Sequence, residues 1–441
     1  MARVSLPYNL FRHISACQRL FVAELGEPIS VAFVLSLGGA AVAGFNVLVA
    51  RQLSPEQFGL LNLVQAVAFF GASFVSLGSS QAAPRLVSGE DTVSSVAWWD
   101  ALKRVFWRAI VPTSIIGGIA AGLWYDWSLS VTAVVITLLA ALGTATLGGN
   151  LLRSAARPII GQFIVQFWRL AMAVAILLLL LLKSEAVTLE STLVLFIAMG
   201  GLALTVTVTS VRALGSHGPI DEAQWSGLRR DSRQFLWITL SLALLNYADR
   251  LVIPSVLTLE ALAQYSAIWW LVGMPFKLFH SGIGFTLLPR LRRFAEPREA
   301  RHLLYTHIAF VCLIAISACV SMYFLTPWLV DILYEGKYSA PRGLVAAMLF
   351  LAVLLISYAI PSSMVGAWGD RRSLASLNMF GWPAAALALA GAWLGGNTWG
   401  LIGVVIGTSL GLALRLTGAI LIAQACWRKN PHDKLAGRCS S

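Results

Sequence analysis

The chain has 441 residues, of which 58% are apolar and only 12% are charged, and its formal net charge is +12. A soluble core cannot bury so large an apolar share, so the composition excludes an ordinary soluble protein. The positive charge does not indicate nucleic-acid binding, because the cations are dispersed through short segments beside apolar runs, where membrane orientation is a sufficient reason for them.

The first 28 residues combine an apolar helical face with basic residues off that face. This pattern predicts an interfacial helix, residues 1–28, lying on the cytoplasmic leaflet, with a loosely ordered tail as the alternative. A cleaved signal peptide is not expected, because the basic residues interrupt the apolar positions and no suitable cleavage site follows.

Twelve apolar runs follow, each about as long as the 20 or so residues that cross a bilayer as a helix. The sequence therefore predicts an all-α polytopic membrane protein with about 12 transmembrane helices. In order, the predicted spans are Ile29–Ala50, Phe58–Ser80, Val105–Tyr125, Leu129–Leu152, Ile159–Leu182, Thr188–Val211, Phe235–Leu257, Leu262–Leu288, Leu303–Leu325, Leu344–Trp368, Leu374–Leu394 and Leu401–Ala425.

The segments between the spans predict the orientation, because short cytoplasmic loops accumulate Lys and Arg. The two ends and the gaps after even-numbered spans hold 24 of the 32 cations. The gaps after odd-numbered spans hold only Arg51, Lys183, Lys337 and Arg342. Both termini are therefore expected to face the cytoplasm.

An internal repeat divides the spans into two sets of six. Leu53-Ser54-Pro55-Glu56 leads to Pro84-Arg85-Leu86, and Leu257-Thr258-Leu259-Glu260 leads to Pro289-Arg290-Leu291, at offsets of 204 and 205 residues. Six spans per copy make the copies parallel, with a central cavity between two lobes. The predicted domains are an N-lobe (29–211), a cytoplasmic linker (212–234), a C-lobe (235–425) and a cytoplasmic tail (426–441).

Charged residues inside spans are costly and are functional candidates. Arg169, Lys277 and Arg415 lie about ten or more residues into their spans, so all three are predicted near the midplane. Together they form a candidate cationic cavity for an anionic cargo, with Gln166 and His280 on the same helical faces. The alternative for each cation is a structural bond to a neighbouring helix.

Asp249 is the only carboxylate well inside a predicted span, and it stands beside Asn246 and Arg250. Two roles are open for this group: a proton or sodium site that couples transport to a gradient, or a counter-ion to a cavity cation. The counter-ion is favoured, because an acid near several cations stays ionised.

No cofactor is expected. The histidines are scattered, no Cys/His spacing resembles a metal site, and no G-x-x-x-x-G-K-[ST] loop exists for direct use of ATP.

The Ala50–Gly59 turn, the Asp249-Arg250 pair, the Leu257–Tyr265 turn and the Pro289-Arg290-Leu291 exit resemble the bacterial polysaccharide (O-antigen-type) flippase family. That family belongs to the multidrug/oligosaccharidyl-lipid/polysaccharide exporter superfamily. The resemblance implies a non-enzymatic flippase of the bacterial cytoplasmic (inner) membrane that serves lipopolysaccharide or other surface polysaccharide synthesis.

The implied cargo is a lipid-linked oligosaccharide on undecaprenyl pyrophosphate, moved by alternating access through the lipid bilayer. The implied partners are polysaccharide polymerase and glycosyltransferases. Arg51, on the outer side, is the candidate exit gate.

Three alternatives remain open. A multidrug or cation exporter of the same superfamily would be expected to carry more buried carboxylates than Asp249 alone. An oligosaccharide polymerase or ligase would be expected to have a long outer loop with catalytic groups, whereas the longest outer gap here runs from Thr326 to Gly343. The third alternative is a lipid II flippase for peptidoglycan, which the sequence does not exclude.

Overall fold

The structure is a computed structural model that describes residues 30–31, 33–83, 97–155, 157–182, 187–214, 220–293, 297–369 and 371–428. The predicted interfacial helix, the Pro84-Arg85-Leu86 exit and the tail beyond Arg428 lie outside these residues. The described chain is helical throughout its regular structure, and nine of its helices are long and apolar enough to cross a membrane by themselves.

The first half of the chain forms the N-terminal bundle. Its helices are Phe33–Gln52, α2 (Pro55–Ala72), α3 (Ser79–Ala82), α4 (Trp98–Val105), the π-helix η2 (Phe106–Ile110), α5 (Val111–Trp124), α6 (Leu129–Ser154), α7 (Pro158–Leu182) and α8 (Leu189–Arg212). The segments α4, η2 and α5 run on as one helix, in which η2 is a single wide turn.

The second half forms the C-terminal bundle. Its helices are α9 (Glu222–Val256), α10 (Leu259–Arg293), α11 (Pro297–Tyr334), α12 (Arg342–Trp368) and α13 (Arg371–Arg428). The chain doubles back within α13 at Gly400, whose φ of 61° and ψ of −142° are not helical. Because α13 thereby supplies two spans, each of the twelve predicted spans has a helical counterpart, and the fold is an all-α, multi-span membrane fold.

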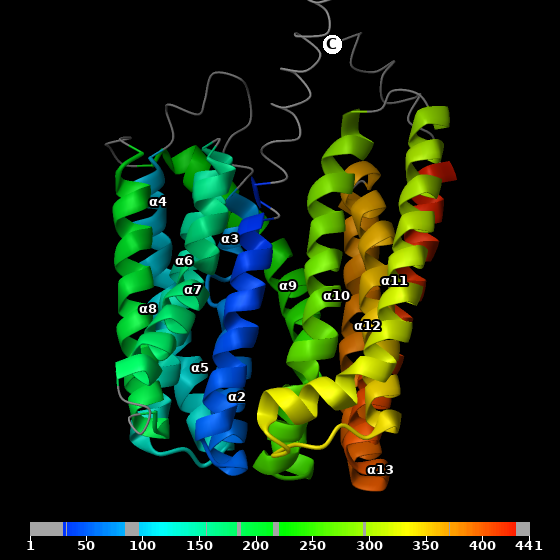
Figure 1. Ribbon diagram of the computed structural model, residues 1–441. Helices are drawn as coiled ribbons and strands as arrows, with labels where there is room; N and C mark the ends of the chain where they lie inside the picture. The colour runs from blue at the N-terminus through cyan, green and yellow to red at the C-terminus, as the bar shows by residue number, and fades with distance from the viewer. Residues whose placement is uncertain are drawn as a thin grey trace, which may run out of the picture.

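The two bundles stand side by side in Figure 1, with their helices close to parallel. Within the N-terminal bundle α6 packs against α2, α5, α7 and α8, and within the C-terminal bundle α12 packs against α10, α11 and α13. Contacts of α2 with α9 and α10, and of α3 with α9, join the two bundles. We call the end that carries the Arg51 turn the outer end, following the predicted orientation, and the opposite end the inner end.

The repeated turn consists of two helix N-caps at the outer end. The Ser54 hydroxyl accepts a hydrogen bond from the Gln57 amide at 3.2 Å, and the Gln57 side chain accepts one from the Ser54 amide. In the second copy the Thr258 hydroxyl accepts from the Ala261 amide at 3.2 Å. Each cap satisfies amides that a helix start leaves without intrahelical partners, so the repeat preserves the start of α2 and of α10.

The structure differs from the prediction in the second span, which is broken between α2 and α3. Leu77 and Gly78 have φ of 49° and 80°, so the backbone leaves the helical region before α3 begins. A Cβ on Gly78 would lie 2.2 Å from the Ser232 carbonyl oxygen of α9. The break therefore lets the two backbones approach each other closely.

Candidate functional site

Three cations from both bundles gather around one phenol. The Lys277 ammonium of α10 and the guanidiniums of Arg250 and of Arg169, which comes from α7, lie within electrostatic range of the Tyr247 hydroxyl of α9. The Lys277 Nζ is 5.1 Å from the Tyr247 ring centre and the Arg250 guanidinium is 5.6 Å from it. The structure therefore brings two of the predicted cavity cations, Arg169 and Lys277, together at Tyr247.

Arg250 is enclosed by aromatic rings. Its guanidinium lies 5.1 Å from the Trp269 ring centre and 5.8 Å from that of Trp270, and the residue is only 6% exposed. Its Nη2 atom has no hydrogen-bond partner among the residues that the structure describes. A ring face attracts a guanidinium but supplies no hydrogen-bond acceptor in its plane, so one donor of Arg250 is left for an acceptor from elsewhere.

The N-terminal bundle positions Arg169 from one side. Its Nη1 donates to the Gln166 side-chain oxygen at 2.6 Å, and its guanidinium lies 5.1 Å from the Phe69 ring centre. Gln166 is itself buried against the first helix, where a Cβ on Gly38 would meet the Gln166 amide at 2.4 Å. The predicted polar face of α7 thus holds Arg169 in place.

We call Arg169, Arg250 and Lys277 around Tyr247 the cationic cluster. No ion pair within 4.0 Å among the described side chains includes any of these three cations. Charges away from bulk water require compensation. The cluster is therefore suited chemically to an anion that offers several oxygen acceptors, such as a phosphate.

The structure does not place the third predicted cation, Arg415, in direct contact with the cluster. Arg415 is 1% exposed, and it donates to Ser241 at 3.3 Å and to the Tyr358 hydroxyl at 3.1 Å. Tyr358 in turn stacks on His280, with ring centres 6.1 Å apart, and the His280 Nδ1 is 2.8 Å from the Leu355 carbonyl oxygen. Arg415 thus joins α9, α12 and α13, and His280 lies between it and the cluster.

The Asp249 carboxylate accepts no hydrogen bond from the side chains of the three cluster cations. The Tyr265 hydroxyl donates to one carboxylate oxygen of Asp249, and the Arg250 backbone amide donates to the other at 2.8 Å. Asp249 is 3% exposed, whereas Asn246, one residue before Tyr247, is half-buried. The carboxylate is therefore enclosed by α9 and α10.

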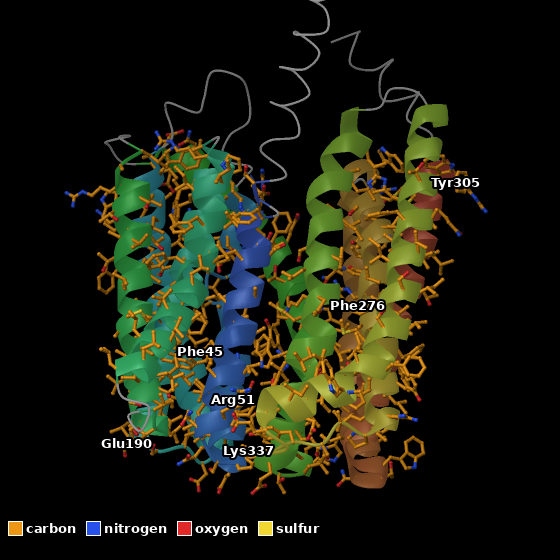
Figure 2. The ribbon with its side chains drawn as sticks, in the orientation of Figure 1. Phe45, Arg51, Glu190, Phe276, Tyr305 and Lys337 are labelled. Carbon is orange, nitrogen blue, oxygen red and sulfur yellow. The ribbon has the colours of Figure 1, made fainter. Side chains whose placement is uncertain are left out.

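At the outer end, Arg51 bridges the two bundles, and Figure 2 labels it near the place where they meet. Its side chain donates to the Leu333 carbonyl at 2.7 Å and the Ile332 carbonyl at 3.2 Å, and it lies 3.3 Å from the Glu335 carboxylate. These carbonyls end α11, which has no further intrahelical donors for them. A cation at a helix C-terminus is favourable, so Arg51 caps α11.

Lys337, from the C-terminal bundle, makes the corresponding contact to the end of a helix in the N-terminal bundle. Its ammonium donates to the carbonyls of Ala50 at 3.0 Å and of Leu53, at the end of the first helix. Burial lowers the pKa of Lys337, and the neighbouring Glu335 carboxylate acts in the opposite direction. We call Arg51 and Lys337 the outer latch, because each bundle supplies the cation that caps a helix of the other.

Two further contacts close the outer end. A Cβ on Gly59 of α2 would lie 2.0 Å from the Leu259 carbonyl oxygen of α10, so these helices meet backbone to backbone. The Tyr125 hydroxyl donates to the Leu251 carbonyl of α9 at 2.8 Å. Together with the outer latch, these contacts hold the outer ends of the bundles together.

Tyr247, Tyr358 and the tryptophans around Arg250 were not predicted as parts of the site, and Lys337 was predicted only as a cation of the outer side. Tyr247 had a usable signal, since it lies three residues before Arg250 and therefore on the same helical face. Lys337 had none, because its partners are backbone carbonyls more than 280 residues away in sequence.

A two-bundle, multi-span helical fold with a largely buried cationic cluster between its halves is the arrangement expected of a membrane transporter. The sequence agrees, because residues 48–341 match the family described as "Polysaccharide biosynthesis protein". The chain belongs to this family. No curated protein sequence matches the chain.

Solved structures with the same fold are similar to it over nearly the whole chain. One is an inward-facing multidrug resistance MATE family transporter of the MOP superfamily, at a TM-score of 0.65 and 14% identity, covering 91% of this chain and 99% of that one. Another is the lipid II flippase MurJ in an inward closed conformation, at a TM-score of 0.62 and 12% identity, covering 90% and 87%. At these identities the likeness establishes the fold.

Proposed function

We propose that this protein moves a lipid-linked oligosaccharide, carried on undecaprenyl pyrophosphate, across the bacterial cytoplasmic membrane for surface polysaccharide or lipopolysaccharide synthesis. The observation that carries the proposal is the cationic cluster, which lacks a carboxylate counter-ion among the described residues. A diphosphate supplies the missing negative charge and several acceptor oxygens, and arginine recognises it by paired hydrogen bonds. Glycosyltransferases and a polysaccharide polymerase are the partners that such a cargo requires.

Transport proceeds by alternating access, with residues 29–211 and 235–425 rocking as two lobes about the linker 212–234. Because the outer latch and the Gly59 contact close the outer end, cargo reaches the cluster from the inner end in this conformation. Release requires the outer end to part, which breaks the capping contacts of Arg51 and Lys337. Arg51 therefore acts as the exit gate jointly with Lys337.

Asp249 is the candidate coupling residue. Its carboxylate accepts hydrogen bonds from the Tyr265 hydroxyl and from the Arg250 backbone amide, so a proton or sodium ion bound there from a gradient would alter the charge beside the cluster. Flipping that continues at an unchanged rate in vesicles whose proton and sodium gradients have been collapsed would remove this role.

The central test neutralises the cluster one residue at a time, as Arg169→Gln, Arg250→Gln and Lys277→Gln. Each variant is expected to lose surface polysaccharide while the lipid-linked intermediate accumulates in the inner leaflet. Arg212→Gln is the matched control, because it removes the same charge from the inner end of α8, away from the cluster. Normal polysaccharide in all three cluster variants, at equal protein levels, would refute the proposal.

A lipid II cargo is the second candidate, because the chain shares its fold with MurJ and a lipid-linked sugar of that kind is also anionic. The two candidates differ in what the cell loses. Failure of the cell wall when the gene is depleted supports lipid II, whereas intact peptidoglycan with missing surface glycan supports the proposed function. Altered drug tolerance with both glycans intact would instead identify a drug exporter.

A further inference from the structure

A cavity lies near the inner end of the C-terminal bundle, apart from the cationic cluster. It has a volume of about 740 Å³ and lies between α9, the α12–α13 junction at Gly369 and the first turns of α13. All of its lining residues belong to the C-terminal bundle. The transport pathway proposed above does not use it.

The residues of α9 that line the cavity change from basic to aromatic and apolar along the helix. Arg230 and Arg233 form its rim, and both are exposed, whereas Trp237 and Ile238 line the part nearer the membrane centre. The spacing of three and four residues places Arg230, Arg233 and Trp237 on one face of the helix. The rim is therefore basic and the wall below it aromatic and apolar.

The opposite wall is apolar near the rim and polar deeper in the cavity. Leu374 and Ala375 of α13 are apolar, and Asn378, one turn further along, has a side-chain oxygen buried without a hydrogen-bond partner in the described chain. The cavity ends just below, because a Cβ on Gly381 of α13 would lie 2.7 Å from the Ser241 hydroxyl of α9. Since the amide of Asn378 can present either its oxygen or its nitrogen, it can bind a polar group of a ligand that lies below the rim, such as an ester of a lipid.

The balance of charge favours an anion. Asp231 is the one carboxylate in the lining, and it lies 3.8 Å from Arg230. Arg233 takes part in none of the ion pairs found between described residues. Two guanidiniums against one carboxylate leave the rim positive at the level where lipid phosphates lie, because the predicted span of α9 begins at Phe235.

We propose that this cavity binds an anionic glycerophospholipid of the surrounding leaflet. Its phosphate lies between Arg230 and Arg233, and an acyl chain packs along Trp237 and Leu374. An arginine pair with an aromatic side chain at the head-group level fits such a lipid, since guanidiniums bind phosphate oxygens and tryptophan prefers the interface. The site is accessible from outside the protein, because the Trp237 side chain in its wall is 51% exposed. The contact of α9 with α3 is made by a different residue, Ser232.

The test is a lipid titration of the purified, full-length protein in detergent, read by native mass spectrometry. Phosphatidylglycerol is expected to bind more tightly than phosphatidylcholine. Arg230→Gln and Arg233→Gln should each weaken phosphatidylglycerol binding about fivefold, and the double variant about thirtyfold. Arg229→Gln is the matched control, because Arg229 lies over Trp225 and beside Glu222, outside the cavity, and its variant should bind within about twofold of the unaltered protein.

Equal loss in the Arg229→Gln control, or equal binding of the two lipids, would overturn the proposal. A second arm uses undecaprenyl phosphate as the probe. If it displaces phosphatidylglycerol from the Arg230/Arg233 site at a lower concentration than phosphatidylglycerol itself, the cavity is a cargo site and the phospholipid assignment fails. Neither arm depends on which glycan the protein transports.

Discussion

Lys337→Met tests the outer latch most directly, because it removes the charge and keeps the length of the side chain. The ammonium caps the first helix through carbonyls of the other bundle, at 3.0 Å for Ala50. Hydrogen bonds to a charged donor contribute about 1.5–3 kcal/mol, and a cation at a helix C-terminus adds about 0.3–1 kcal/mol. Lys337 is partly solvated, so screening reduces the sum to about 2 kcal/mol.

These contacts exist only when the outer ends meet, so their loss acts on the equilibrium between outer-closed and outer-open states. A change of about 2 kcal/mol shifts the ratio of the two states about thirtyfold. The assay is pulsed electron spin resonance in a cysteine-free background, with labels at Glu190→Cys and Asn397→Cys. Lys337→Met is expected to add a population with a longer distance between the labels.

Arg342→Met is the matched control for this experiment, because it removes a cation from the outer start of α12 and has no contact across the bundles among the hydrogen bonds and ion pairs of the described chain. Its distance distribution should match that of the unaltered protein. Arg51→Met should resemble Lys337→Met, and the double variant should shift further. Three distributions identical to the unaltered one would refute the view that the outer latch holds the bundles together.

Three other changes probe separate parts of the structure. Tyr247→Phe removes the hydroxyl shared by the cluster, and the rate of flipping in proteoliposomes should fall about tenfold, as expected for a loss of about 1–1.5 kcal/mol. Gly59→Leu places a side chain against the Leu259 carbonyl, so the outer ends should separate in the same spin-label assay. If they stay together, the protein should be destabilised by about 1–3 kcal/mol, which is measured as a lower melting temperature in detergent. Arg415→Met should lower thermal stability through the lost bond to Tyr358 and leave cargo affinity unchanged; reduced affinity at unchanged stability would instead place Arg415 in the binding site.

The span pattern could be predicted from the sequence because bilayer thickness fixes the length of an apolar helix, and hydropathy is a local property. The break between α2 and α3 could not. The run from Ser73 to Gly78 is apolar or small, as a continuous span would be, and only the approach of α9 at Ser232 requires the backbone to leave the helix. In this segment the packing against α9, and not the helix propensity of the residues themselves, determines the backbone conformation.

The site was predictable in part for a similar reason. A cation inside a span is rare, so Arg169 and Lys277 could be selected from their positions within apolar runs of the sequence. Aromatic residues are common in spans, so the only signal that distinguished Tyr247 from the other tyrosines was its spacing of three residues from Arg250. The position of Arg415 also depends on packing, because its depth along α13 is right for the cluster while its direction, toward Tyr358, can be learned only from the fold.

The hydrogen bonds of Asp249 explain why the positive charge of the cluster is not balanced by this carboxylate. If this carboxylate paired with Arg169 or Lys277, the charge between the bundles would be largely balanced from within. Instead both of its oxygens accept from α9 and α10, through the Arg250 amide and the Tyr265 hydroxyl. The cations that face Tyr247 therefore lack an internal carboxylate at hydrogen-bonding distance. An anionic head group that enters the site gains their charge without first displacing a protein carboxylate, and cationic drugs meet repulsion in the same place.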